Sequence, residues 1–172
     1  MERIIQLYEL YKESVFGYFL RMTGSKEEAA DLTQETFYQA CLSLFRFKRE
    51  SSLKTWLFSI ARNVYLKSVR EKGKRRALIR EGPIPENLPA PGPPDPSAEA
   101  LLLKEERERI KKGLAQISEK DRTIIILREF EGLSYEEIAG VFNQSANWAR
   151  VNFFRAKKRL GEICREQEDD DV

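Results

Sequence analysis

The sequence contains no histidine, only two cysteines and no long apolar run. Histidine is the commonest general base and metal ligand, so its absence argues against a catalytic or metal-dependent protein. Cys41 and Cys164 lie far apart without a CxxC spacing, which offers no zinc site and suits a reducing compartment. No stretch approaches the roughly 18 apolar residues that span a bilayer, and no signal-peptide pattern opens the chain. We therefore expect a cytoplasmic protein that is not inserted in a membrane, is not an enzyme and needs no metal or cofactor.

Proline is confined to one segment. All seven prolines lie between Pro83 and Pro96, in the stretch GPIPENLPAPGPPDPS, and the rest of the chain has helical periodicity. A proline-rich segment cannot continue a helix and favours polyproline II geometry. We therefore expect an all-α protein with two small helical domains, at residues 1–81 and 98–172, and a Pro-rich linker at 82–97. If extended, this linker spans on the order of 50 Å at about 3.1 Å per residue, which is longer than one turn of DNA.

Charge is nearly balanced over the whole chain, with a formal net charge of +2, but its distribution is uneven. Residues 62–80 carry eight lysines and arginines and one acidic residue, and residues 150–159 carry five and no acidic residue. Two basic patches in separate halves of a nearly neutral protein favour two surfaces that contact phosphates. A single basic run is more often a solvated helix face, so each patch needs further support.

The first domain is expected to contain three helices. The first covers about residues 4–21, and Ser25 with Glu28 predicts a capping box at the start of the second. On this second helix one face is expected to lie inward, formed by Ala30, Thr33, Phe37, Ala40, Cys41 and Leu44. Another face carries Asp31, Gln34, Glu35 and Tyr38 at helical spacing. That face is either solvated or a docking surface for an arginine-rich partner.

The third helix follows a turn around residues 46–52 and ends in the first basic patch. Its inward positions are Trp56, Leu57, Ile60, Ala61, Val64 and Ser68. Its outward positions are Arg62, Asn63, Leu66, Lys67 and Arg70. An outward asparagine among basic side chains strengthens the case for a nucleic-acid surface. We expect Trp56 to be a core residue and not a wedge inserted into DNA.

The second domain is expected to hold four helices and to end in a helix-turn-helix. The first of the four is marked by Leu103, Ile110, Leu114 and Ile117. The other three start after the capping serines Ser118, Ser134 and Ser145, and Gly132 closes the second of the four. A short helix at residues 135–141, a turn of three residues and a longer basic helix are typical of a helix-turn-helix. The small Ala139 lies where its two helices would cross.

The final helix has the most informative pattern. Its inward positions are Ala149, Phe153, Ala156 and Leu160. Its outward positions are Asn147, Arg150, Val151, Phe154, Arg155 and Lys158. Asparagine and arginine hydrogen-bond to the edges of adenine and guanine in the major groove, and apolar side chains meet thymine methyl groups. A large aromatic such as Phe154 on the polar side of a basic helix needs a partner, which is either DNA or a neighbouring helix or domain.

Three motifs resemble the sigma-70 family, and together they cover nearly the whole chain. The stretch EEAADLTQETFYQA (27–40) is similar to region 2.2 of that family, and SSLKTWLFSIARNVYLKSVREKGKRR (51–76) is similar to regions 2.3 and 2.4. LREFEGLSYEEIAGVF followed by FFRAKKRL is similar to region 4. Regions 1.1 and 3 are missing, which is typical of the extracytoplasmic-function group. The resemblance implies a sigma factor that binds core RNA polymerase and directs promoter recognition and transcription initiation.

The resemblance also implies roles for individual residues. Positions that bind the clamp helices of the polymerase β′ subunit are matched by Asp31, Gln34 and Glu35. Asn63 matches an asparagine that recognises an unstacked base of the −10 element, and the loop at 49–54 matches the loop that lines the pocket for that base. The full set expected at the −10 DNA is Arg49, Ser51, Lys54, Arg62, Asn63, Lys67 and Arg70. The set expected at the −35 DNA is Asn147, Arg150, Val151, Phe154, Arg155 and Lys158. An anti-sigma factor is a further expected partner.

The start of the final helix departs from the family pattern. The family usually has Gly-Thr-Val-Lys/Arg-Ser-Arg where this sequence reads Asn147-Trp148-Ala149-Arg150-Val151-Asn152. Asn152 in place of arginine removes a phosphate contact, so we expect a −35 sequence that differs from the common one. Two other readings remain open. A stand-alone helix-turn-helix regulator explains the second domain but not the motifs at 27–76, and a pure protein-interaction module would bury Phe154 and Trp148 in a partner.

Overall fold

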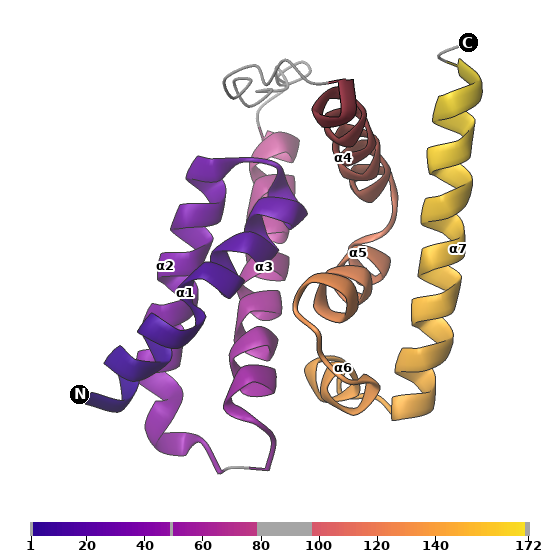
Figure 1. The fold of residues 1–172 in the computed structure, drawn as a ribbon. Helices are drawn as coiled ribbons and strands as arrows, with labels where there is room; N and C mark the ends of the chain where they lie inside the picture. The colour runs from indigo at the N-terminus through magenta and orange to yellow at the C-terminus, as the bar shows by residue number, and fades with distance from the viewer. Residues whose placement is uncertain (1, 49, 79–97, 171–172) are drawn as a thin grey trace.

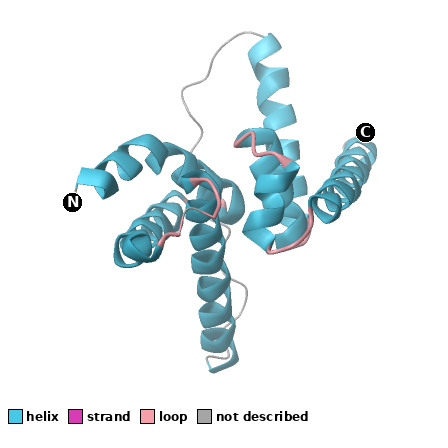
Figure 2. Cartoon of the chain, turned by 90° about the horizontal axis from the view of Figure 1, so that it is seen from below, coloured by secondary structure: helices cyan, strands magenta, loops and turns pink. Residues whose placement is uncertain are grey.

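A computed structural model describes residues 2–48, 50–78 and 98–170, and every regular element in these ranges is helical (Figure 2). The first half of the chain forms α1 (Glu2–Thr23), α2 (Lys26–Ser43) and α3 (Leu53–Leu78), with a 3-10 turn, η1 (Leu44–Arg46), after α2. The second half forms α4 (Ala98–Gln116), α5 (Glu119–Ile125), α6 (Tyr135–Phe142) and α7 (Ala146–Asp170), with a π-helical turn, η2 (Ile126–Phe130), after α5. The expected all-α class and the four helices of the second half are confirmed. The expected linker at 82–97 lies outside the described residues.

Serine side chains cap the helices at the positions that the sequence predicts. Each accepts a hydrogen bond from the backbone N–H three residues further on, at Ser25, Ser118, Ser134 and Ser145. The reciprocal bond of a capping box is present at Ser134, whose N–H donates to the Glu137 carboxylate at 2.9 Å. At Ser25 the expected box is half formed, because the Glu28 carboxylate accepts a hydrogen bond from Lys72 on α3 instead.

The turns between helices use the residues that tolerate a positive φ. Gly24 ends α1 with φ 71° and Gly132 ends η2 with φ 66°. Asn143, in the left-handed conformation with φ 54°, turns the chain between α6 and α7. Asparagine and glycine are the residues most often found in this conformation, so the helix-turn-helix turn is encoded locally. The acute connection brings α7 across α6, with Ala139 buried as expected.

The buried face of α2 is rotated around the helix relative to the expected one. Leu32 and Thr36 are buried, although the sequence pattern did not place them inward, whereas Ala30 and Cys41 are exposed. The reason is that α2 packs against both α1 and α3, and the helix face between these two neighbours is the stripe that contains Leu32 and Thr36. The two buried threonines donate their hydroxyl hydrogens to carbonyls four residues earlier, at 2.6 and 2.7 Å, so neither hydroxyl is left unsatisfied.

The two halves lie side by side and share one hydrophobic core (Figure 1). Tyr18 of α1 and Phe58 of α3 belong to the same buried cluster as Ile124 of α5, Ile138 of α6 and Phe153 of α7. Across this core the Tyr18 hydroxyl lies 3.4 Å from Oγ1 of Thr123, and burial raises the pKa of Tyr18, so the phenol stays protonated and able to donate. The sequence predicted two helical domains but not this shared core. None of the described helices combines the length and the apolarity needed to cross a membrane.

The two halves approach closely where α6 meets the start of α3. A Cβ added at Gly140 would lie 2.9 Å from Cγ2 of Thr55, a buried side chain whose Oγ1 lies 2.9 Å from Oγ of Ser52. No methyl group fits there without moving one helix. The absence of a side chain at Gly140 therefore sets how closely α3 and α6 pack.

We predict that Gly140→Ala weakens the contact between the halves. Overpacking of this kind lowers the free energy of unfolding by about 1–3 kcal/mol. The higher helix propensity of alanine offsets roughly 1 kcal/mol of this loss. Gly161→Ala on α7 is the matched control, because a Cβ there meets nothing within 4 Å and only the propensity gain remains. Thermal unfolding should show a lower midpoint for Gly140→Ala than for Gly161→Ala. Equal midpoints would contradict tight packing of α6 on α3.

Candidate nucleic-acid interface and docking surface

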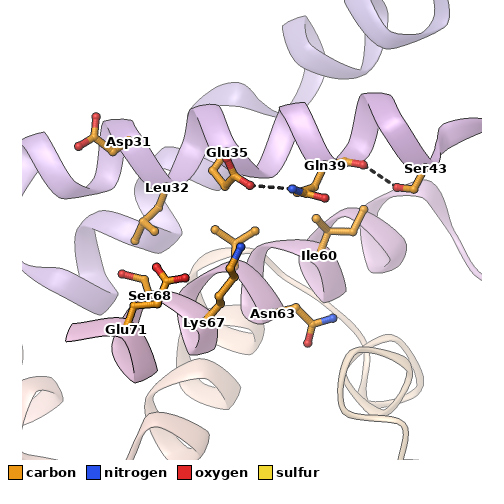
Figure 3. Close-up of a pocket in the computed structure, with 11 residues that line it drawn as sticks. Asp31, Leu32, Glu35, Gln39, Ser43, Ile60, Asn63, Lys67, Ser68 and Glu71 are labelled. Carbon is orange, nitrogen blue, oxygen red and sulfur yellow. Dashed lines mark hydrogen bonds between the residues drawn. The ribbon is translucent and has the colours of Figure 1, made fainter. Parts of the chain in front are cut away.

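The three residues expected to dock a protein partner lie together on the outer surface of α2. Asp31 and Gln34 are exposed, and Glu35 is half-buried at the edge of the α2–α3 groove. Oε1 of Glu35 accepts a hydrogen bond of 2.7 Å from Nε2 of Gln39, one turn further along the helix (Figure 3). This bond holds the Glu35 carboxylate in place along the groove. The helical spacing seen in the sequence is therefore realised as a continuous outward stripe.

A groove of about 660 Å³ runs between α2 and α3 and brings two predicted sets of residues together. Asp31 and Glu35, expected to bind polymerase, line its α2 side, while Asn63 and Lys67, expected at the −10 DNA, line its α3 side (Figure 3). The remaining polar lining consists of Ser68, expected to face inward, and of Gln39, Ser43 and Glu71, which no sequence pattern pointed to. Asn63 and Lys67 are exposed, as is Arg70 further along α3. These three are open to solvent.

Arg62, expected on the DNA-facing side of α3, is engaged by the second half of the chain. Its Nε and Nη2 atoms donate to the two carboxylate oxygens of Glu119 at 3.0 and 3.1 Å, in a paired arrangement that suits guanidinium and carboxylate. The same guanidinium lies 4.2 Å from the centre of the Phe142 ring. Both side chains of the ion pair are largely buried, with 20% and 24% exposure. In this structure Arg62 is not free to track a DNA strand.

The loop before α3 is also held by the second half. Nζ of Lys54 donates to the backbone oxygen of Glu131 at 2.5 Å, and the Ser52 hydroxyl donates to Glu137 at 3.2 Å. Ser51 is exposed, and Arg49 lies outside the described residues. The predicted −10 residues thus fall into two groups. Ser51, Asn63, Lys67 and Arg70 are accessible, whereas Lys54 and Arg62 contact α5, α6 and the turn between them.

Two arginines reinforce the contact between the halves. Nη1 of Arg122 on α5 donates to the backbone oxygen of Met22 at the end of α1, at 2.7 Å. The guanidinium of Arg21 lies 4.1 Å from the centre of the Phe130 ring. Neither role could be predicted from the sequence, because each arginine contacts a residue roughly 100 positions away and no local pattern indicates such a partner. The two halves are therefore joined by polar contacts as well as by apolar packing.

The outward face of α7 is as the sequence predicts. All six expected residues are exposed, namely Asn147, Arg150, Val151, Phe154, Arg155 and Lys158. Ala149, Phe153 and Ala156 face inward and are buried, and Leu160 is half-buried against α4. Phe154 retains 59% exposure and touches Phe153 edge-on at 5.5 Å, so no neighbouring helix covers it. The alternative in which Phe154 packs on the other half of this chain is wrong.

Asn152, expected to mark a lost phosphate contact, has a structural role. Its side chain is buried, donates to the backbone oxygen of Trp148 at 2.9 Å and accepts from Nζ of Lys120 at 3.0 Å. The bond from Lys120 therefore links α7 to the start of α5. Trp148, the bulky residue near the start of α7, is half-buried and packs its ring 5.1 Å from that of Phe142.

Two of the basic residues in the patch at 150–159 are used within the fold. Arg159 donates to the buried carboxylate of Asp121 at 2.5 Å, which joins α7 to α5. Lys157 lies 3.3 Å from the carboxylate of Glu129 in an exposed pair. Exposed pairs contribute little stability, so Lys157 exchanges this partner easily, whereas removing Arg159 would leave a buried charge. Arg150, Arg155 and Lys158 form the cationic part of the outward face.

The comparisons with known proteins agree with this geometry. The Sigma-70 region 2 family matches residues 7–75, and the Sigma-70 region 4 family matches residues 107–160. The RNA polymerase sigma factor YlaC of Bacillus subtilis is 31% identical over 159 residues, which cover 92% of this chain and 90% of that protein. The ECF RNA polymerase sigma factor SigM of the same organism is 30% identical over 158 residues, which cover 91% of this chain and 92% of that protein.

A solved structure shares the arrangement of the two halves. The sigma factor RpoE in complex with the anti-sigma factor NepR, from Bartonella quintana, matches with a TM-score of 0.77 and 25% identity, covering 96% of this chain and 98% of that one. Such a score over nearly the whole length requires both helical halves to superimpose together. The chain therefore belongs to the sigma-70 family of RNA polymerase sigma factors, in its extracytoplasmic-function (ECF) group.

Proposed function

We propose that this sigma factor docks on core RNA polymerase through the outer face of α2, reads the −35 element with α7 and captures the opened −10 strand with α3. The observation that carries the proposal is the outward face of α7, where an uncovered phenylalanine lies among arginine, lysine and asparagine on the second helix of a helix-turn-helix. This mechanism requires no chemistry by the chain. It operates in the cytoplasm, where polymerase and promoter DNA meet.

Reading of the −35 element follows from the residue types on α7. Arg150 and Arg155 suit the acceptor pair of a guanine edge, and Asn147 suits an adenine edge. Val151 and Phe154 offer apolar contact to thymine methyl groups. Lys158 supplies phosphate contacts, and so does Lys157, whose exposed ion pair with Glu129 breaks easily. Such contacts position the helix without reading sequence. Asn152 is buried and bonded within the fold, so its side chain is not available for a phosphate contact.

Capture of the −10 strand requires a change in the contacts of α3. Asn63, Lys67 and Arg70 are accessible, but Lys54 and Arg62 are bound to α5, α6 and η2. For all five to reach DNA, the second half must move away from α3. Binding of core polymerase at α2, together with −35 DNA at α7, would supply the free energy for this exchange, since a ligand shifts such an equilibrium by its difference in affinity for the two states.

An inhibitory partner fits the same scheme. The RpoE–NepR complex has its two halves arranged as in this chain, and RpoE there is bound to an anti-sigma factor. We propose that an anti-sigma factor stabilises the closed arrangement of this chain, in which Arg62 stays paired with Glu119. Such a partner would act by population shift, and no new contact between the halves needs to form.

The docking assignment is tested by reversing charge on α2. Asp31→Lys with Glu35→Lys should abolish binding to core polymerase, because both carboxylates would become cations facing an arginine-rich surface. Glu105→Lys with Glu108→Lys, two exposed acids on α4, is the control and should bind as the wild type does. Co-sedimentation with purified core polymerase measures this. Retained binding by the α2 variant would refute the assignment, and failure of the wild type to bind would favour a stand-alone DNA-binding regulator.

The −35 assignment is tested at Arg155. Arg155→Ala should cost roughly 1–3 kcal/mol of promoter binding and relax the preference at one −35 position, if the side chain makes a paired contact with a base. Arg165→Ala, an exposed arginine further along α7, should leave both unchanged. Selection from a randomised −35 library by the holoenzyme gives the preference at each position. Uniform weakening on all sequences would show that Arg155 touches only phosphate.

The proposed opening of the contact between α3 and the second half is tested at Glu119. Glu119→Gln removes the charge that holds Arg62, with an expected loss of about 1–3 kcal/mol from the contact between the halves. The isolated variant should therefore populate an open arrangement with a larger radius of gyration in small-angle X-ray scattering. Glu129→Gln, which removes only the exposed partner of Lys157, is the control. Scattering curves that superimpose for Glu119→Gln and the wild type would show that this pair does not hold the halves together.

A further inference from the structure

Three large apolar side chains are exposed in one line along α2 and η1. Tyr38 is 58% exposed, Leu42 52% and Phe45 78%. Their spacing of four and three residues places them on one helix face, and the same face carries Asp31, Gln34 and Glu35 immediately before them. A contiguous apolar patch on a soluble protein, bordered by polar residues, marks an interaction surface more often than scattered single side chains do.

The core of the first half does not explain these three residues. Their neighbours Phe37 and Ala40 fill the buried side of α2, where the ring of Phe37 packs 4.9 Å from that of Tyr8. Tyr38 and Leu42 point away from this packing and remain in solvent. Because the buried face is complete without them, their apolar character is free to serve a partner.

The acidic residues that precede the apolar stripe along α2 disfavour DNA as the partner. Between Lys26 and Arg46 the chain has no lysine and no arginine, but it has four acidic residues. One of the four, Glu28, is paired with Lys72, and the rest leave the outer face of α2 negative. A phosphate backbone would be repelled by this face. A second copy of the chain is disfavoured for the same reason, since two acidic faces would meet.

The shape of the surface suits a helical partner. From Asp31 to Phe45 the stripe covers 15 residues, and the rise of 1.5 Å per residue separates its two ends by about 21 Å. A single row of side chains of that length packs well against another helix lying along it. The partner that fits is a helix or helical pair with cationic side chains opposite Asp31 and Glu35 and apolar side chains opposite Tyr38 and Leu42.

We propose that Tyr38, Leu42 and Phe45 form the apolar half of the surface that docks core RNA polymerase, and that they supply most of its binding energy. The inference rests on the proposed function, because it extends the α2 surface assigned there to polymerase. The carboxylates of Asp31 and Glu35 set register and association rate, as rim charges do. The apolar half contains the tyrosine, a residue type enriched among those that dominate interface energies.

The test uses the full chain and purified core polymerase, without promoter DNA. A triple variant, Tyr38→Ala, Leu42→Ala and Phe45→Ala, should weaken binding at least about thirtyfold, as loss of a central anchor does. The control variant, Leu102→Ala with Leu103→Ala, removes exposed apolar side chains from α4 and should bind core polymerase as the wild type does. Circular dichroism checks that both variants keep their helices, which is expected because all five side chains face solvent.

The salt dependence separates the two halves of the surface. Asp31→Asn with Glu35→Gln should flatten the dependence of affinity on ionic strength, whereas the triple alanine variant should lower affinity and keep the wild-type slope. Triple-variant binding within threefold of wild type overturns the inference and leaves the proposed function standing. Equal loss in the α4 control also overturns it. Failure of the wild type to bind core polymerase overturns both, and a wild-type dimer that the triple variant abolishes reassigns the stripe to self-association.

Discussion

The packing of α3 against α5 and α6 is the constraint on which the arrangement of this sigma factor depends. It combines an apolar core that both halves share, a glycine that lets α6 approach α3, and the paired hydrogen bonds between Arg62 and Glu119. Each of these three contacts alone contributes modestly to stability, but all of them act on the same short stretch of α3. Because an arginine left without its carboxylate in a half-buried site is costly, the ion pair makes partial separation of the halves unfavourable. The contact therefore favours either full closure or full opening.

The same stretch of α3 carries residues that the family resemblance assigns to promoter DNA. Glu119 and Phe142 offer Arg62 a carboxylate and an aromatic face, whereas a single DNA strand offers it phosphates and bases. In the proposed mechanism the two sets of partners are chemically alike, so one side chain would serve both states without being buried unpaired in either. Such substitution keeps the difference in free energy between the states small, which is what allows a binding partner to shift the balance between them.

Short-range rules predicted the local structure well. The four serine caps, the turn residues Gly132 and Asn143, and the outward face of α7 each follow from residues within one or two helical turns, and all lie where the sequence placed them. Contacts between distant residues were not predictable. The bond from Lys120 to Asn152 and the ion pair from Arg62 to Glu119 link positions 32 and 57 residues apart, and no periodicity within either helix records its partner. Burial of Leu32 and Thr36 depends on α2 touching two neighbours at once.

The uninterrupted length of α7 has a consequence for how the protein meets a duplex. Its 25 residues form a rod about 37 Å long. Every side chain proposed to face DNA lies in the leading half, and the sequence of the trailing end is acidic, through Glu166, Glu168, Asp169 and Asp170. A straight rod cannot fold its own acidic end back onto its basic end, so the two opposite charges stay apart. A DNA phosphate backbone attracts the basic end of α7 and repels the acidic end. These long-range electrostatic forces would orient α7 before any base is contacted.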